Sequence, residues 1–553
     1  MKTTKKGPEQ TANEIGEMLK AEVAFVEKYN CVKGFLNLSL SNEFLVDFLK
    51  EIHLNESFFT LPQKSEKVVL EYCGPNTNKP LHIGHLRNMF IGFAMGEILK
   101  ANGNEVIKVN INNDRGIAIC KSIAAYMLFG NGTTPASTGI KGDHFVGDFY
   151  VKFNSVVKEQ LAEKYQVPAD EDVYKFIGKD KDALEQETPI FEKAKELLLK
   201  WEADDKETVD LWNTMNGWVY KGFQETFDTL GIDFQKEYYE SQTYNLGKDI
   251  VLDGLEKGIF KKRADGAIVV DLTSDGLDEK VLLRADGTSI YITQDIGTAI
   301  LRHQEFSMDK MIYVVMNEQD YHFKVLKLIL QKMGYSWADG IYHLSYAMVG
   351  SPTGRFKSRE GKTADADDLI HEVLSIAEAK TKELGKTDGF SADESKKLYD
   401  TIGLGALKYF ILRVNAYKNI IFNPEESIEF QGHTGPFIQY THARIKSIIR
   451  KANIDTLQIE MPYDLQPSER EVLNVLYDYP TVLASAAASY EPSELANYVY
   501  NLAKTYNKFY NECPVLVANT DNEKQFRIML SANVAAMIKN CMQLLGIDVP
   551  EKM

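Results

Sequence analysis

The spacing of apolar residues between positions 68 and 103 predicts a buried strand, a polar loop and a helix in direct succession. Residues 68–70 are all aliphatic, as in strands that are buried on both faces. A polar turn with glycine and proline follows, and from about His85 apolar side chains recur at helical spacing, up to an end at Asn102 and Gly103. The helix should therefore begin at the loop, where its unpaired N–H groups form a ready site for an anion.

The same pattern continues along the chain and predicts a parallel sheet. Residues 105–111 read as a second strand, and residues 311–316 form a continuous apolar run that is typical of a central parallel strand. A strand, a helix and a further strand make a right-handed crossover, and ligands collect at the carboxyl ends of such strands. After a helix-rich insertion at about 130–240 the α/β pattern resumes, with strands predicted at 267–272 and 281–284.

The two ends of the chain differ from this central region. Near the N-terminus the pattern predicts a helix at 12–28, a strand at 34–40 and a helix at 42–52. After a linker-like stretch at 385–389, a capping box begins at Ser391 and the pattern is almost entirely helical to residue 553. We therefore expect three domains, at 1–66, 67–385 and 390–553.

Composition narrows the class of protein. The 553 residues exceed one ordinary domain, and the hydrophobic (44%) and charged (26%) contents are those of a soluble globular protein. The chain begins without the apolar core of a signal peptide, and no apolar run reaches the ~18 residues of a membrane span. Five scattered cysteines argue against disulfides and a zinc ribbon and predict a cytoplasmic protein without zinc. A net charge of −16 excludes a polybasic nucleic-acid binder, although an acidic protein still binds RNA when its basic residues share one surface.

His82 and His85 are the candidate chemical groups at the start of the first helix. Gly84 between them has no side chain, so a planar ligand can approach the backbone there. This arrangement suits a nucleotide whose phosphates lie against the helix end; the alternative is a pair of polar residues that only cap the helix. The preceding strand, Pro75 and Asn76 in the turn, and the following helix favour the nucleotide site.

Two basic segments are candidates for contact with phosphate. The glycine-containing loop at 350–362 carries four positive charges. Most such loops are mobile surface segments, but a loop that closes over phosphates has the same composition. Residues 444–451 concentrate positive charge in an otherwise acidic chain, and they fit an RNA contact and a plain solvated face equally well.

The residues around the two histidines resemble the HIGH motif of class I aminoacyl-tRNA synthetases, and the wider pattern is most similar to the arginyl-tRNA synthetases. The motif is carried by Pro75, Asn76, Lys79 and the sequence HIGHLR at 82–87. Further segments resemble the family in the same order, at 142–145, 291–295, 313–323, 432–444 and 544–553. The resemblance covers nearly the whole chain.

The resemblance implies a fold and a reaction. The fold would be α/β and multidomain, with a Rossmann-like catalytic domain that carries an insertion, a short N-terminal α/β domain that binds the tRNA body, and a C-terminal all-helical anticodon-binding domain. The enzyme would activate L-arginine with ATP to arginyl-adenylate and transfer it to the terminal adenosine of tRNA, and activation would need bound tRNA. Mg²⁺ would come with ATP, held mainly by phosphates and water, with no metal site of the protein's own. A monomer is expected.

The resemblance also implies roles for particular residues. Preorganised hydrogen bonds to the ATP phosphates would make His82, His85 and Lys79 catalytic. Residues in contact with ATP would be Pro75, His82, Gly84, His85, Lys357 and Arg359. Residues in contact with arginine would be Glu71, Asn76, Tyr291, Asp295 and Gln319, with Asp295 on the guanidinium or, alternatively, only capping a helix. Residues in contact with tRNA would be Arg444, Lys446 and Arg450.

The chain departs from the family pattern in two places. The second class I motif, KMSKS, is degenerate here and reads RFKSR at 355–359, with Ser358 in place of the usual lysine. Lys79 is expected to replace the missing charge. The N-terminal domain is shorter than is usual in the family, so an incomplete domain with weaker contacts to the tRNA body is expected.

Two other functions fit parts of the pattern. A HIGH-type nucleotidyl transferase that adenylates a small acid without tRNA would not need the long helical C-terminal region. A non-catalytic tRNA-binding relative would not need His82, His85, Glu71 and Asp295 together. Both alternatives are therefore less well supported than a tRNA-charging enzyme.

Overall fold

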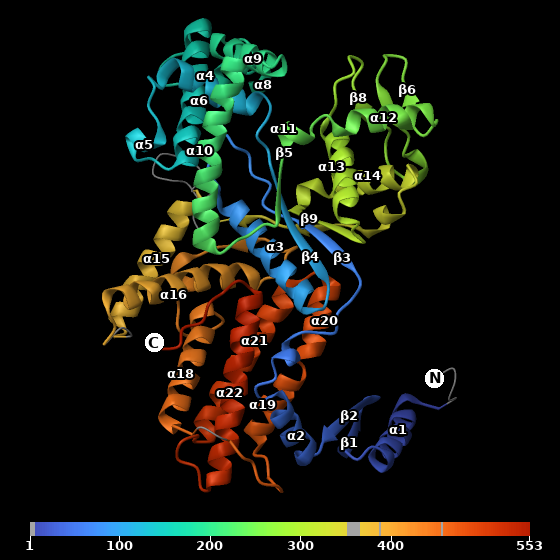
Figure 1. Cartoon of the computed structure of the whole chain (residues 1–553), viewed down its shortest axis with the longest axis vertical. Helices are drawn as coiled ribbons and strands as arrows, with labels where there is room; N and C mark the ends of the chain where they lie inside the picture. Colours follow the sequence, from blue (N-terminus) through green and yellow to red (C-terminus); the bar gives the residue numbers. More distant parts are fainter. Residues whose placement is uncertain (1–5, 351–364, 386–388, 455–456) are drawn as a thin grey trace.

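Five parallel strands form the central sheet of the structure, a computed structural model that describes residues 6–350, 365–385, 389–454 and 457–553. The strands lie in the order β10-β9-β3-β4-β5, which confirms the expected parallel sheet. In chain order they are β3 (Lys67–Glu71), β4 (Glu105–Asn112), β5 (Lys236–Tyr239), β9 (Lys310–Met316) and β10 (Ile341–Tyr346). Figure 1 shows β3, β4 and β9 in the middle of the molecule.

β3 lies at the centre of the sheet because its side chains are apolar on both faces. Val69 and Leu70 are fully buried and belong to different cores. Leu70 shares a core with helix α3 (Ile83–Ala101), and Val69 shares one with α13 (Tyr291–Phe306) and α14 (Asp320–Lys332). α3 is buried over most of its surface, since C-terminal helices cover the side that faces away from the sheet.

A layer of helices is inserted between β4 and β5. Its members are α4 (Ile117–Phe129), α5 (Pro135–Thr138), α6 (Gly142–Tyr165), α7 (Val173–Ile177), α8 (Lys181–Glu185), α9 (Pro189–Glu202) and α10 (Lys206–Leu230). α4 packs against α6 and α9, and α6 packs against α10. The inserted layer therefore begins earlier and ends earlier than the expected range of about 130–240. It begins earlier because α4 packs in this layer, and it ends earlier because β5 pairs with β4 in the central sheet.

The strands expected at 267–272 and 281–284 form a separate sheet. β6 (Lys261–Lys262), β7 (Ile268–Val270) and β8 (Lys280–Leu283) pair in antiparallel fashion. The short connection through η2 (Thr273–Asp275) cannot make the crossover that parallel neighbours need. Two helices precede this sheet, α11 (Glu240–Thr243) and α12 (Leu246–Glu256), and α12 packs against α13.

From residue 366 the described chain is helical almost to its end, as expected. The helices are α15 (Ala366–Glu383), α16 (Ala392–Leu412), α17 (Pro424–Ser427), α18 (Gly435–Ala452), α19 (Pro467–Tyr477), α20 (Tyr479–Ser489), α21 (Pro492–Glu512) and α22 (Asp521–Leu544). The capping box at Ser391 and Glu394 is confirmed. Within the described ranges, no helix has the length and apolar character needed to cross a membrane.

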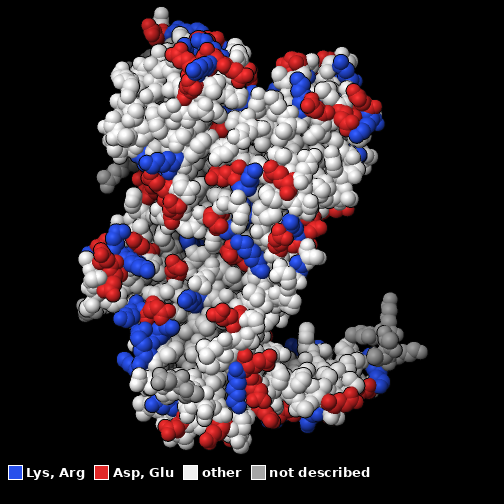
Figure 2. Space-filling model, in the orientation of Figure 1, with Lys and Arg blue, Asp and Glu red and all other residues white. Residues whose placement is uncertain are grey.

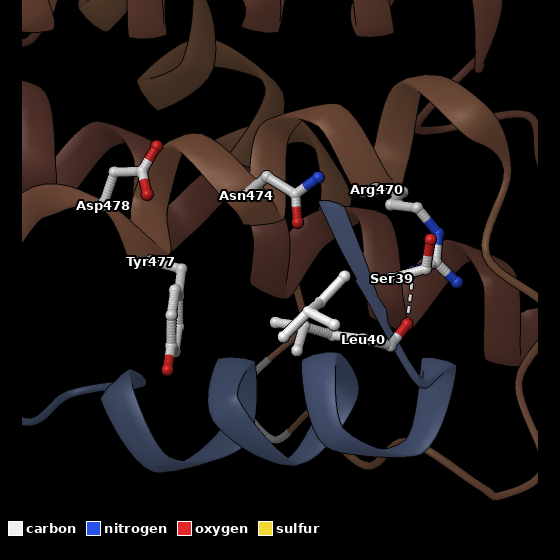
Figure 3. A pocket seen from close by; sticks show the side chains of 7 residues that line it. Ser39, Leu40, Arg470, Asn474, Tyr477 and Asp478 are labelled. Carbon is white, nitrogen blue, oxygen red and sulfur yellow. Dashed lines mark hydrogen bonds between the residues drawn. The ribbon is translucent and has the colours of Figure 1, made fainter. Parts of the chain in front are cut away.

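The N-terminal segment packs on the C-terminal helices through α2 (Asn42–Ile52). Phe44 and Phe48 of α2 pack edge-to-face against Tyr477 of α19. Arg470 of α19 donates a hydrogen bond of 2.7 Å to the carbonyl of Leu40. Figure 3 shows this bond at the rim of a hollow between α19 and the strand that precedes α2.

The helix expected at 12–28 is wrong in its second half. α1 spans Pro8–Glu22, and β1 (Val26–Val32) pairs in antiparallel fashion with β2 (Phe35–Leu40). The β-branched and aromatic residues at 23–32 favour a strand, and the partner strand decides between the two structures. Figure 1 shows this hairpin and α1 projecting from the body of the molecule.

Arg87 of α3 connects three segments that are distant in sequence. Its side chain is fully buried, and its guanidinium donates hydrogen bonds to five backbone carbonyls. The acceptors are Ala347 (2.6 Å), Met348 (3.2 Å), Asn415 (3.4 Å), Ala416 (3.0 Å) and Lys418 (2.8 Å). The first two lie after β10 and the others after α16, where β11 (Val349–Gly350) and β12 (Ile420–Ile421) pair. Arginine suits this position because its two terminal amino groups lie in one plane and donate to all five carbonyls, while its Nε–H has no hydrogen-bond partner among the described residues.

Replacing Arg87 with lysine should lower the thermal stability of the protein. An ammonium has three donors and cannot reach all five carbonyls, so we expect a loss of about 2–4 kcal/mol and a midpoint lower by several degrees. Differential scanning calorimetry measures this change, with the exposed Arg284→Lys as the matched control. Equal midpoints for the two variants would contradict the assigned role of Arg87.

Candidate active site

The helix α3 begins with a cap that is built from the two histidines. The backbone N–H of Gly84 donates to Nδ1 of His82 (3.1 Å), and the backbone N–H of His82 donates to Nδ1 of His85 (3.1 Å). The ring centroids lie 3.9 Å apart. A Cβ at Gly84 would lie 2.9 Å from the His82 ring, so glycine is needed for this cap. The expectation that the histidines cap the helix and the expectation that they bind an anion are therefore compatible.

The cap determines which ring nitrogen of each histidine carries the proton. Because Nδ1 accepts a hydrogen bond in both rings, the proton of the neutral imidazole lies on Nε2. Burial and the nearby charge of Lys79 lower the pKa of His82 to about 4, and burial, His82 and Lys79 lower the pKa of His85 well below its usual value. Both rings are therefore neutral at pH 7 and each offers one N–H donor.

Lys79 lies close to both histidines, since its charge lowers their pKa values. Its side chain is half-buried, and burial lowers its own pKa. The carbonyl of Pro75 accepts a hydrogen bond of 2.9 Å from the backbone N–H of Asn113, which fixes the loop after β3 beside the end of β4. The predicted residues Pro75, Lys79, His82, Gly84 and His85 thus belong to one loop and helix start.

Glu71 at the end of β3 has a partner that the sequence did not indicate. Its carboxylate forms an ion pair with Arg302, whose side chain is fully buried. The Arg302 guanidinium also lies over the ring of Tyr238, 4.7 Å from its centroid. Glu71 is therefore already neutralised inside the protein.

Two further carboxylates belong to this region, since the charge of Asp295 acts on both Glu71 and Glu240. Asp295 of α13 forms a 2.6 Å contact with Nε2 of His322, and its side chain is 38% exposed. Glu240 begins α11, and burial raises its pKa to about 7, with smaller effects from Arg115, Asp114 and Asp295. Within the described part of the chain, the Glu240 carboxylate has no hydrogen-bond or ion-pair partner. This half-buried group is suited to receive a cation from outside.

The remaining predicted pocket residues lie at the surface of the same edge. Asn76 is exposed in the loop after β3, Gln319 is exposed in η3 (Asn317–Gln319), and Tyr291 is 78% exposed at the start of α13. No hydrogen bond joins the side chains of these three described residues to Asp295. The predicted ATP contacts Lys357 and Arg359 lie outside the described residues.

The three basic residues predicted to bind tRNA lie on α18 and have partners within the protein. Arg444 donates to Asn507 (2.7 Å), Lys446 forms an ion pair with Glu551 (3.1 Å), and Arg450 donates to the carbonyl of Glu551 (2.9 Å). Figure 2 shows acidic and basic side chains interspersed over one face of the molecule. The negative net charge of the whole chain therefore does not mean that this face is uniformly acidic.

The sequence analysis did not identify Arg302, His322 or Glu240 as site residues, although the positions of Arg302 and Glu240 in the sequence indicate their place in the fold. Arg302 follows Asp295 by two helical turns, which places both on one face of α13. Glu240 directly follows β5, at the edge where polar residues after strands meet ligands. Recognising residues 236–239 as a strand of the sheet would have identified it.

Comparisons with known proteins find similar proteins over the whole length of the chain. The family model described as tRNA synthetases class I (R), catalytic domain, matches residues 49–424, and the DALR anticodon binding domain matches residues 438–553. Proteins named arginine–tRNA ligase from Bacteroides thetaiotaomicron and Flavobacterium psychrophilum are 50% and 48% identical; the alignments cover 100% and 99% of this chain and 92% and 90% of theirs. The solved Thermus thermophilus arginyl-tRNA synthetase has the same fold, with a TM-score of 0.81 at 24% identity, over 100% of this chain and 92% of that one.

The two half-buried histidines should destabilise the protein as the pH falls. Their pKa values are lower in the folded state than the usual value of about 6.5 in an unfolded chain, so the unfolded state binds more protons between about pH 6.5 and 4. The contribution of the two histidines to the free energy of unfolding is therefore full above about pH 6.5 and is lost on acidification. Thermal midpoints of the wild type and of the double variant His82→Gln, His85→Gln, measured across this range, should converge as the pH falls. Parallel curves would contradict the lowered pKa values.

Proposed function

The chain belongs to the class I arginyl-tRNA synthetases, and from this membership we propose which of its residues perform the reaction. The enzyme attaches L-arginine to its tRNA in an ATP-dependent reaction for protein synthesis, as the family model and the full-length relatives show. The residue assignments rest on one observation above all: the helix cap holds two neutral imidazoles with their Nε2–H groups unused by the cap.

The two histidines and Lys79 bind the phosphates of ATP. In the activation step, an oxygen of the arginine carboxylate attacks the α-phosphorus, the bond to the β-phosphate oxygen breaks, and pyrophosphate leaves. Negative charge builds on the phosphate oxygens, where the Nε2–H groups of His82 and His85 and the start of α3 stabilise it. Lys79 lies beside both rings and supplies the positive charge that the degenerate 355–359 motif lacks.

Asp295 and Glu240 receive the guanidinium of the substrate. Arg302 already neutralises Glu71, so the open negative charge of this region is left on the other two carboxylates. A guanidinium satisfies two carboxylates with a planar set of donors, whereas the ammonium of lysine would leave acceptors unpaired in a desolvated pocket. Tyr291 covers the guanidinium, and Glu71, Asn76 and Gln319 lie nearer the α-amino and carboxyl end of the substrate.

Mg²⁺ enters with ATP and is held by its phosphates and by water. Among the described residues, the group Asp143, His144 and Asp367 has the spacing of a metal site, but the ammonium of Lys141 lies 2.6 Å from Asp367 and takes the place of the cation. This group therefore does not fit Mg²⁺, and the ion's role is to neutralise phosphate charge.

The C-terminal helices bind the anticodon arm of tRNA, with Arg444, Lys446 and Arg450 of α18 as candidate phosphate contacts. The match of residues 438–553 to the DALR anticodon binding domain supports this assignment. It also disfavours an adenylating enzyme that works without tRNA. The domain limits 1–66, 67–385 and 390–553, a monomeric state and a cytoplasmic location stay predictions.

Arginine-dependent exchange of pyrophosphate into ATP tests the proposed function. We expect exchange with arginine, and not with lysine, when tRNA is present. Lys79→Ala should lower kcat by about 10²-fold, because a preorganised charge on the phosphates is lost. The exposed Lys64→Ala is the matched control and should be fully active. Exchange with another amino acid but not with arginine would refute the substrate, and an active Lys79→Ala would refute the role of Lys79.

The binding of arginine should depend on the charge of Glu240. Because burial raises the pKa of this carboxyl to about 7, it loses its charge as the pH falls below that value, and the arginine KM should rise. Glu240→Gln should raise the KM about tenfold or more at about pH 8 and remove most of its pH dependence. The exposed Glu256→Gln on α12 is the control. A Glu240→Gln variant with the pH profile of the wild type would exclude Glu240 from the pocket.

A further inference from the structure

The segment Gly142-Asp143-His144-Phe145 has no role in the reaction as described so far. It lies at the start of α6, which is locked against α10 by close backbone contact. A Cβ at Gly142 would lie 1.9 Å from the carbonyl oxygen of Trp218, and a Cβ at Gly222 would lie 2.3 Å from Asp143. The start of α6 therefore has a fixed position, and the side chains that project from it are preorganised.

His144 and Lys141 both bind one carboxylate of α15. Nε2 of His144 lies 2.8 Å from Oδ2 of Asp367, and Nζ of Lys141 lies 2.6 Å from the same oxygen. The hydroxyl of Thr226 on α10 donates to the other oxygen, Oδ1, at 3.0 Å. Burial alone would lower the pKa of His144, but the hydrogen bond with Asp367 and the charges of Asp143, Asp365 and Asp367 raise it. Three helices thus meet at Asp367.

The start of α15 is in turn fixed to the phosphate-binding loop. Asp365 caps α15 by accepting from the backbone N–H of Asp368 (2.8 Å), and its other oxygen lies 3.5 Å from Nδ1 of His144. The backbone of Asp365 forms an antiparallel bridge with His82, and the N–H of Ala366 donates to the carbonyl of Leu81 at 2.8 Å. Any shift of the α15 start would therefore move the backbone of His82.

The same helix α6 also contacts the loop from the other side. A Cβ at Gly147 would lie 2.7 Å from Pro80 and 3.5 Å from the Cα of Lys79. The loop from Lys79 to His82 is thus held between α6 and the start of α15, and the contacts of His144 with Asp367 and Asp365 join these two supports.

We infer that His144 is a positioning residue for ATP, which acts through Asp367 and Asp365 to hold Lys79 and His82 where they meet the phosphates. His144 does not touch the substrate in this role. The inference rests on the proposed phosphate-binding role of the Lys79–His82 loop. It predicts an effect on ATP and not on arginine, because Asp295 and Glu240, which are proposed to bind the guanidinium, belong to α13 and α11 and not to α6, α15 or the Lys79–His82 loop.

The test is a comparison of His144→Ala, His144→Gln and His371→Ala in pyrophosphate exchange with tRNA present. Displacement of the reacting groups by a fraction of an ångström to 1 Å should lower kcat/KM for ATP by about 10–10²-fold in His144→Ala. His144→Gln retains a donor toward Asp367 and should recover part of the loss. His371 is exposed on the same helix α15, so His371→Ala should behave as wild type.

Two further readouts separate positioning from a general structural role. In His144→Ala the arginine KM should be unchanged, and the thermal midpoint should stay near that of His371→Ala. Unchanged ATP kinetics in His144→Ala would overturn the inference, and so would an equal loss for ATP and arginine with a lower midpoint. Absence of arginine-dependent exchange in the wild type would instead refute the proposed function itself.

Discussion

Helix α3, which begins with the histidine cap, is held by one buried side chain. The guanidinium of Arg87 donates to backbone carbonyls that follow β10 and α16, so the position of α3 is coupled to the exit from the sheet and to the entry into the C-terminal helices. No carboxylate is among the acceptors, which are all backbone carbonyls. Because α3 also carries the histidine cap, the residues proposed to bind phosphate are connected through Arg87 to the segments that follow β10 and α16.

The sequence predicted most accurately the parts of the fold that are determined locally. The unit of β3, α3 and β4 follows from uninterrupted apolar runs and helical spacing, and it lies within a few residues of the expectation. β5 and the antiparallel sheet depend on pairing with distant strands, and β1 was mistaken for helix because its partner was not considered. The site shows the same division. His82, His85 and Lys79 are neighbours in the chain and could be predicted together, whereas the pair of Glu71 with Arg302 joins residues that only the fold brings together.

The pair of Glu71 with Arg302 also determines which carboxylates of the proposed pocket are left to bind the substrate guanidinium. A permanent guanidinium, Arg302, occupies Glu71, and Tyr238 covers it. Of the other two carboxylates in this group, Asp295 contacts His322 and Glu240 has no hydrogen-bond or ion-pair partner among the described residues, so a second guanidinium is proposed to bind to them. In the proposed pocket the protein thus uses its own arginine to define where the substrate arginine does not bind.

The histidine cap at the start of α3 bears on attempts to stabilise the enzyme by design. Serine, aspartate and asparagine are stronger N-cap residues than histidine, and a procedure that optimises helix ends would select one of them at position 82. A variant with serine, aspartate or asparagine at position 82 would keep the hydrogen bond from the backbone N–H of Gly84. It would lose Nε2 of His82, which the cap does not use. With the role proposed for His82, stability and activity are therefore opposed at this position, and consensus rules for helix ends should not be applied to it.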